Sequence, residues 1–363
     1  MDALDYPRTR KGLDAIILPR LLSYGFAHFA VDLACVASLF AMLRLNSIGA
    51  ADSLFFVVLY NSIAFGTQVF FGYAVDELRA PRQAALAGLV LSASAVAVTA
   101  YSPLAVVLLA GVGNSLFHVG AGGISLNLSP GRASAPGVFV APGAAGLALG
   151  VVFGMGIGFS QAPLILLLTG AAYLVLRAGN PGMDYERKAI AKPPLLGLSL
   201  ALLLLVIMSR SFIGFAVSFP WKADIFLLAI LTAAVVAGKS AGGMLADRFG
   251  WLRVSLIGLI ASAPLLAFAP TIPAIAIIGA FFFQMTMAVT LVAVAAVFPG
   301  RPAFSFGLPC LAILSGALPY FAGMTQWANG GLNTLAVILV TALFLAAGLM
   351  GILRDLIKCD DNQ

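Results

Sequence analysis

Two stretches of the sequence, "GYAVDELRAPR" at 72–82 and "GMLADRFGWLR" at 243–253, carry the same pattern of glycine and charge. Both fit G-x3-D-x5-R, and the matching residues are 171 positions apart: Gly72, Asp76 and Arg82 in the first stretch, Gly243, Asp247 and Arg253 in the second. Each stretch follows a long apolar segment and has the composition of a tight, charged turn. The chain is therefore predicted to consist of two repeats with this turn at the same place in each.

The amino-acid composition indicates whether these repeats lie in water or in a membrane. Of the 363 residues, 61% are hydrophobic and only 9% are charged, and the mean hydropathy is +1.05. A soluble domain has roughly 25% charged residues, so the sequence predicts an all-α integral membrane protein. We predict twelve membrane-spanning helices, at 17–43, 52–75, 83–100, 103–128, 134–158, 161–178, 195–220, 224–246, 252–269, 272–298, 303–326 and 332–353.

The basic residues predict the orientation. If the N-terminus is cytoplasmic, 15 of the 20 Lys and Arg residues fall on the cytoplasmic side and only Arg44 and Lys222 on the other. This is the positive-inside bias, so both termini are expected to be cytoplasmic in a multi-pass protein of the cell (inner) membrane. Because the basic residues occupy loops between spans, the net charge of +6 does not indicate nucleic acid. Within spans lie Arg20, Arg210 and Lys239.

The predicted domains follow from the repeat. Residues 1–178 are expected to form an N-terminal six-helix bundle and residues 195–363 a C-terminal one, joined by a basic cytoplasmic linker at 179–194. Cys35, Cys310 and Cys359 are too few for a disulfide framework or a metal cluster and are interpreted as packing residues. The sequence contains no pattern for a cofactor or a metal, so we expect none. The partners expected are membrane lipid, a small solute and protons, for a monomer.

The charged turns resemble the signature turn of the major facilitator superfamily, and the second copy, with Arg248 and Gly250, is the better match. The first copy departs from the family pattern because Glu77 stands where the family usually has Arg. The resemblance implies two parallel six-helix bundles that rock around a midplane cavity, with the turns acting as gates. "PGAAGLALG" in the fifth span is also similar to the superfamily's antiporter motif, which implies a gating role for Pro142 and Gly146. Its small residues are expected to let the fifth and eighth spans approach closely.

Four further stretches resemble the fosmidomycin-resistance-like branch of that superfamily: "AHFAVD" at 27–32, "GNSLFHVGAGG" at 113–123, "RASAPGVFVAPGAAGLALG" at 132–150 and "MSRSFIGFAVSFP" at 208–220. Val119 replaces a proline that is common in the branch, and the acidic residue that often follows is missing. These departures bear on the substrate more than on the fold.

His28 and Asp32 are the first candidate site residues. At positions i and i+4 of a helix they share one face, which Tyr24 and Cys35 extend. Asp32 is the one acidic residue that our span assignment places in mid-membrane, where an ionised carboxylate costs about 2.5–3.5 kcal/mol. We expect His28 and Asp32 to carry a coupling proton. The alternative is that Asp32 only hydrogen-bonds His28 to fix the packing.

The remaining candidates are expected to bind substrate. His118 lies on a polar stripe with Asn114 and Ser125, and its role is either functional or structural. Arg210 needs an anion in mid-membrane, which could be Asp32, backbone carbonyls or a bound substrate. Lys239 either lines the cavity or extends to the cytoplasm. We add as expected substrate contacts or lining residues Tyr24, Asn61, Gln68 and Gln284.

Together these features predict a secondary active transporter of a small organic solute that is anionic or zwitterionic, working as a proton-coupled exporter. One alternative is an importer or exchanger of an anionic metabolite. A second is a non-transport sensor or enzyme on the same fold, for which the sequence offers no convergent set of nucleophile, base and metal ligands.

Overall fold

The computed structural model describes residues 17–156, 159–179, 181–186, 196–326 and 331–360, the side chains of 355–360 excepted. Its helices are α1 (Ile17–Leu45), α2 (Ala50–Asn61), the π-helical turn η2 (Ser62–Gly66), α3 (Gln68–Leu78), α4 (Pro81–Ala97), α5 (Pro103–Leu128), α6 (Ser134–Met155), α7 (Gln161–Arg177), α8 (Leu196–Ala216), the 3-10 turn η3 (Pro220–Ala223), α9 (Ile225–Phe249), α10 (Trp251–Phe268), α11 (Pro273–Gln284), α12 (Met287–Ala296), α13 (Pro302–Phe321) and α14 (Gly331–Asp360).

The predicted all-α membrane fold is confirmed. In the described part of the chain, ten helical stretches are long and apolar enough to span a membrane, with α2 to α3 and α11 to α12 each counted as one. The shorter helices α4 and α7, of 17 residues each, occupy the other two predicted positions. Large apolar side chains project outward, and Leu78, Phe70 and Phe226 are at least 70% exposed. Such a surface suits a lipid surrounding.

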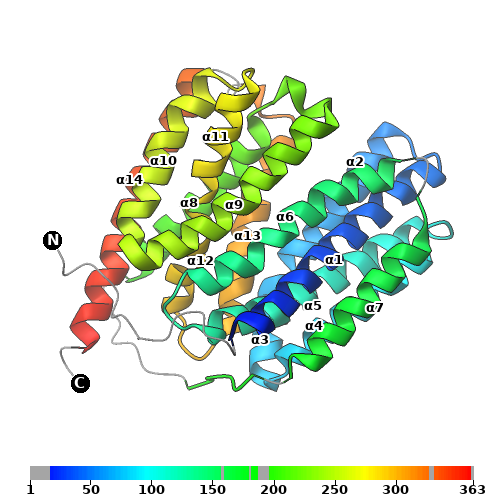
Figure 1. Cartoon of the computed structure of the whole chain (residues 1–363), viewed down its shortest axis with the longest axis horizontal. Helices are drawn as coiled ribbons and strands as arrows, with labels where there is room; N and C mark the ends of the chain where they lie inside the picture. The colour runs from blue at the N-terminus through cyan, green and yellow to red at the C-terminus, as the bar shows by residue number, and fades with distance from the viewer. Residues whose placement is uncertain (1–16, 157–158, 180, 187–195, 327–330, 361–363) are drawn as a thin grey trace.

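The helices form two groups, which are visible side by side in Figure 1. In one group α1 packs against α5, α6 and α7, and α4 packs against α5 and α7. In the other, α8 and α10 pack against α14, and α11 packs against α9 and α10. The groups meet where α6 contacts α9 and where α13 contacts α3 and α5. The linker limits at 179 and 194 stay a prediction, because residues 180 and 187–195, with Arg187, Lys188 and Lys192, lie outside the described parts.

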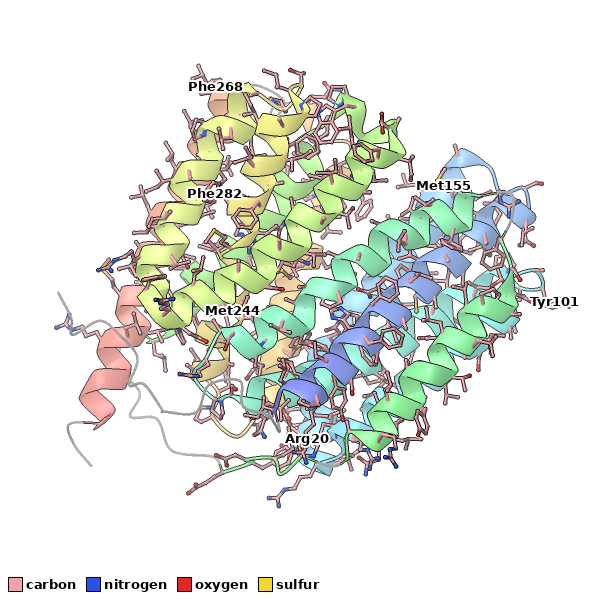
Figure 2. All side chains as sticks on the ribbon, in the orientation of Figure 1. Arg20, Tyr101, Met155, Met244, Phe268 and Phe282 are labelled. Atoms are coloured by element: carbon pink, nitrogen blue, oxygen red, sulfur yellow. The ribbon has the colours of Figure 1, made fainter. Side chains whose placement is uncertain are left out.

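The two helix groups converge at one end, which we call the closed end: α3 and α9 terminate there, and α6 and α13 begin there (Figure 1). They diverge toward the opposite end in the same view. Figure 2 shows Arg20 toward the closed end and Tyr101 and Met155 at the opposite end. Which end faces the cytoplasm stays a prediction from the charge pattern.

Both repeated turns reverse the chain through a residue with a positive φ, although the ψ values differ, 39° at Arg79 and 138° at Gly250. Between α3 and α4, Arg79 has a φ of 52°, and between α9 and α10, Gly250 has a φ of 95°. These residues are 171 positions apart, the offset of the sequence repeat. A positive φ reverses the chain within a residue or two, and Gly250 adopts it without the steric cost that a side chain brings. Helix α4 then begins with Pro81 at its first turn, where proline is tolerated.

Candidate functional site

At the closed end, each half of the molecule caps a helix of the other half. The carboxylate of Asp76, near the end of α3, accepts hydrogen bonds from the backbone N–H groups of Ala303 (3.0 Å) and Phe304 (2.8 Å) at the start of α13. Asp247, near the end of α9, accepts from Ala133 (2.7 Å) and Ser134 (2.9 Å) at the start of α6. The free N–H groups and the positive dipole of a helix N-terminus favour a carboxylate there.

The two glycines of the repeat permit this contact. A Cβ built on Gly72 would lie 2.8 Å from the carbonyl carbon of Ala303, and one on Gly243 would lie 2.9 Å from that of Ala133. Both distances are shorter than a carbon–carbon contact allows. Only glycine therefore lets α3 and α9 come close enough for the carboxylates to reach the opposite helix.

The receiving helices carry a second repeat that the sequence analysis missed. "PGR" occurs at 130–132, before α6, and at 299–301, before α13. Gly131 and Gly300 have φ values of 71° and 73°. Each loop so turned presents the N-terminus of its helix to the carboxylate of the other half. The signal was available in the sequence, but its meaning depends on knowing what the helix N-terminus faces.

The arginines of the two turns contact other groups than the capping carboxylates of Asp76 and Asp247. Arg82 donates from Nη2 to the carbonyl oxygen of Leu176 (2.7 Å), within its own half. The guanidinium of Arg248 lies over the ring of Phe249, and Arg253 is exposed. Glu77, the departure from the family pattern, forms an ion pair of 3.3 Å with Arg301 of the other half.

A buried polar cluster joins α1 to α5. Asp32 Oδ2 lies 3.1 Å from His28 Nε2, and Asp32 Oδ1 lies 3.6 Å from His118 Nε2. Asn114 donates from Nδ2 to Asp32 Oδ1 (3.0 Å), and the Nε2 atoms of the two histidines are 2.9 Å apart. All four residues are at most 6% exposed. The i, i+4 spacing predicted that His28 and Asp32 lie on one face; that His118 and Asn114 meet them is new.

Helix α6, which belongs to the same half, packs over this cluster. The His28 ring stacks on Phe139, with 4.8 Å between ring centroids, and its Nδ1 donates to the Phe139 carbonyl oxygen (2.9 Å). A Cβ built on Gly143 would collide with His28 Nε2 and would lie 2.6 Å from Asp32 Oδ2. Gly143 is thus needed for the close approach of α6 to the cluster.

The small residues of α6 have a different partner from the one we expected. We took the run around Pro142 and Gly146 to bring the fifth and eighth spans together. Instead, Pro142 lies against Gly25 of α1, and a Cβ on Gly146 would meet Phe29 and Leu33 of α1. The approach to α9 is made nearer the closed end, at Gly137. The reason is the helical period, which turns the two ends of this run toward different neighbours.

Arg210, on α8, is the buried cation of the other half and is only 8% exposed. Its Nη2 donates to the Phe283 carbonyl oxygen (3.1 Å), and its guanidinium lies 5.3 Å from the centre of the Phe283 ring. Phe283 precedes the break between α11 and α12, where the regular helical bonds are interrupted. Of the partners considered for Arg210, the structure thus supplies a backbone carbonyl, which is neutral; its Nε has no hydrogen-bond partner among the described residues.

Lys239 of α9 is the second cation of the C-terminal half near these polar residues. It is partly buried and close enough to Asp32, Arg210 and His118 for their charges to interact. The cluster of α1 and α5 therefore faces a second group of charges, Arg210 and Lys239, from the opposite half. No hydrogen bond or ion pair joins the two groups directly in the part of the chain that is described.

The other predicted lining residues are buried or partly buried. Tyr24 is 1% exposed, and its hydroxyl has no partner in the described structure. Gln68 is fully buried and donates to the Ala64 carbonyl, leaving Oε1 without a partner there. Asn61 donates to Val57 of its own helix, Ser125 donates to Gly122, and Gln284 is partly buried at the α11–α12 break.

Cys35, which we interpreted as a packing residue, lies on the same buried stripe. Its Sγ lies within hydrogen-bonding reach of both Ser92 Oγ (3.3 Å) and the Ala110 carbonyl oxygen (3.6 Å), and so ties α1 to α4 and α5. Cys310 is buried in α13, and the Cys359 side chain lies outside the described parts.

The known proteins that resemble this chain establish its fold but not its family branch or its substrate. No family model and no curated protein matches the sequence. Among solved structures, the chain is similar to the E. coli fucose:proton symporter FucP (TM-score 0.64, 12% identity, 94% of this chain and 99% of that one). It is also similar to the human organic anion transporter MFSD10 (TM-score 0.64, 15% identity, 92% of this chain and 99% of that one). A third similar structure is a bacterial homologue of the iron transporter ferroportin in an outward-facing state (TM-score 0.61, 13% identity, 94% of this chain and 99% of that one). The chain therefore has the major facilitator fold, and the resemblance to one branch of that superfamily stays a prediction.

Proposed function

We propose that the chain is a secondary active transporter that exports a small organic anion or zwitterion in exchange for protons, by alternating access. The observation that carries this proposal is the placement of a buried carboxylate–imidazole cluster in one half opposite two cations in the other, the buried Arg210 and the partly buried Lys239. Each half alone holds charges that are costly in a membrane, and a ligand between them would complete their balance.

Proton coupling is supported by the chemistry of the cluster. Asp32 has two imidazole neighbours, and imidazole is the side chain whose charge changes most readily near neutral pH. A group that gains or loses a proton according to which side of the membrane it meets can couple a pH gradient to transport. Asp32 and His28 are the proposed coupling residues.

An anionic or zwitterionic substrate is supported by the opposite half. Arg210 stays charged inside a protein, and its Nε is buried without a partner among the described residues. It lies beside an interrupted helix, and in transporters discontinuous helices accompany the binding site. With Lys239 nearby, the second half supplies two positive charges that a carboxylate or a phosphonate would satisfy. His118, Asn114, Tyr24, Gln68 and Gln284 are the proposed further contacts.

Alternating access is supported by the asymmetry of the contacts between halves. The capping carboxylates, the close-packed glycines and the Glu77–Arg301 pair all lie toward the closed end. In the proposed orientation this end is cytoplasmic, so the structure corresponds to an outward-facing state of an inner-membrane protein. The ferroportin homologue that the chain resembles was solved in an outward-facing state, which agrees with this reading.

The test is uptake of candidate organic anions into proteoliposomes, with and without an imposed pH gradient. The proposal expects substrate flux that follows the gradient and a counterflow of protons measured with a pH-sensitive dye. Gradient-independent exchange would leave the alternative of an anion exchanger, and flux of protons and solute in the same direction would indicate an importer. Absence of any flux, with binding retained, would favour a sensor.

A further inference from the structure

The tautomers of both histidines are fixed by their neighbours. His28 Nδ1 lies 2.9 Å from the Phe139 carbonyl oxygen, and His118 Nδ1 lies 2.8 Å from the Asn114 carbonyl oxygen. A carbonyl oxygen can only accept a hydrogen bond, so each Nδ1 must carry a hydrogen. A neutral imidazole has one N–H, and each ring in its neutral form therefore presents a bare Nε2 to the cluster.

The two Nε2 atoms are 2.9 Å apart. Two bare lone pairs would repel at this distance, whereas an N–H donating to the other nitrogen gives an ordinary hydrogen-bond length. Two imidazoles on one tetrahedral metal ion, with metal–nitrogen bonds of about 2.0–2.1 Å, would place their nitrogens about 3.3 Å apart. The spacing therefore fits a proton between the rings better than a shared metal ion.

We propose that His28 and His118 share a single proton, so that His118 is the second station of the coupling proton. This inference rests on the proposed function and extends the coupling site beyond His28 and Asp32. In the transfer, the N–H bond at His28 Nε2 breaks and one forms at His118 Nε2, and the positive charge moves with the proton. Nothing else is consumed, because each Nδ1–H stays in place.

The counter-charge favours the His28 side in this conformation. Asp32 Oδ2 is 3.1 Å from His28 Nε2, whereas Asp32 Oδ1 is 3.6 Å from His118 Nε2. With one proton on the pair and an ionised Asp32, the cluster has no net charge. Asn114 positions both partners: its Nδ2 donates to Asp32 Oδ1, and its carbonyl holds the His118 ring.

His118 is the member that faces the other half. Its ring centroid lies 6.4 Å from that of Phe306 on α13, and its charge interacts with Lys239 on α9. Moving the proton to His118 therefore brings positive charge toward Lys239, which is unfavourable until an anion binds between them. The remaining titratable groups that face the cluster from its own and neighbouring helices are Tyr24, Cys35, Tyr60 and Cys310.

The chain contains two histidines, so nitrogen NMR of ¹⁵N-histidine-labelled protein, purified without a histidine tag, reports on these rings alone. At neutral pH we expect both Nδ1 atoms to be protonated and the two Nε2 resonances to titrate together as one unit. An Nε2–H tautomer in either neutral ring, or two Nε2 resonances that titrate independently, would overturn the proposal. This wild-type measurement does not depend on the folding of any variant.

Variants extend the test. His118→Gln should shift the His28 Nε2 resonance and remove the joint titration, while Ser125→Ala, a buried polar change on the same helix, should leave both unchanged. An unchanged His28 resonance in His118→Gln would also overturn the sharing of the proton. Failure of the proposed function is distinguishable: joint titration with transport insensitive to a pH gradient would keep the shared proton and reject the coupling.

Discussion

At the scale of single residues, the coupling role proposed for Asp32 gives the first prediction. Asp32→Asn keeps the size and the hydrogen-bonding ability of the side chain but removes its charge and its proton. Gradient-driven uptake should fall by at least tenfold, while substrate binding and exchange persist. Uptake in proteoliposomes at fixed pH gradient measures this, with Asp52→Asn, at an exposed acid of α2, as the matched control. Wild-type uptake by the Asp32 variant would place the coupling elsewhere.

Gly143 gives a second prediction at this scale. A methyl group there would displace His28 and Asp32, and overpacking of a buried site typically costs about 1–3 kcal/mol. Gly143→Ala should therefore lower the melting temperature and change both histidine resonances. Gly170→Ala is the control, because a Cβ at Gly170 meets nothing within 4 Å. Equal melting temperatures and unchanged resonances in the two variants would contradict the close packing of α6 on the cluster.

The limits of sequence-based prediction are clear at the same residues. His28 and Asp32 were placed together because four residues along a helix fix their relation. His118 could not be joined to them, because it lies 90 residues away and its position depends on how α5 crosses α1. Glu77 looked like a loss of the family pattern. Its pairing with Arg301 becomes visible only when the two halves are in contact.

At the scale of helices and turns, the capping carboxylates of Asp76 and Asp247 are predicted to act as a latch, that is, to stabilise the conformation in which this end of the molecule is closed. Asp247→Ala removes two hydrogen bonds to the start of α6, and losing such a cap costs about 0.5–2 kcal/mol. If the two conformations are nearly balanced, the population should shift several-fold toward the state that is open at this end. Distances between spin labels across the closed end measure the shift.

Arg253→Ala is the matched control for the latch, because Arg253 belongs to the same turn and is exposed. Distance distributions that are identical in wild type and Asp247→Ala would reject the latch. Asp76→Ala, which removes the equivalent cap on α13, should act in the same direction, and the double variant should exceed either single one.

Helix positions were predictable from apolar length alone, but interruptions within helices were not. The second span was expected at 52–75 and runs from Ala50 to Leu78 with a π-helical turn in it. The tenth was expected as one helix and is broken after Gln284, in a stretch without proline or glycine. At the break the Phe283 carbonyl accepts from Arg210 of α8, a tertiary contact that the local sequence does not reveal.

At the scale of the whole molecule, the distribution of charge between the halves predicts the charge of the substrate. One half holds an acid and two imidazoles, and the other holds Arg210 and Lys239. The two cations outnumber the single acid, so the centre is net positive even when Asp32 is ionised, and the low dielectric of the site demands a balancing anion. Phosphonates or carboxylates should therefore bind better than lipophilic cations.

Binding to purified protein at two pH values, in wild type and Arg210→Ala, tests this charge balance. Removing a guanidinium that pairs with a substrate anion should weaken binding by about 10- to 100-fold, a loss of about 1.5–3 kcal/mol, whereas Lys222→Ala, outside the spans, should not. The sign of the pH effect then separates the mechanisms. In antiport the proton and the anion compete, so affinity should rise with pH; in symport they assist each other, so affinity should fall. Cations that bind best, with no loss in Arg210→Ala, would reject the anionic substrate and leave a transporter of cationic solutes on the same fold.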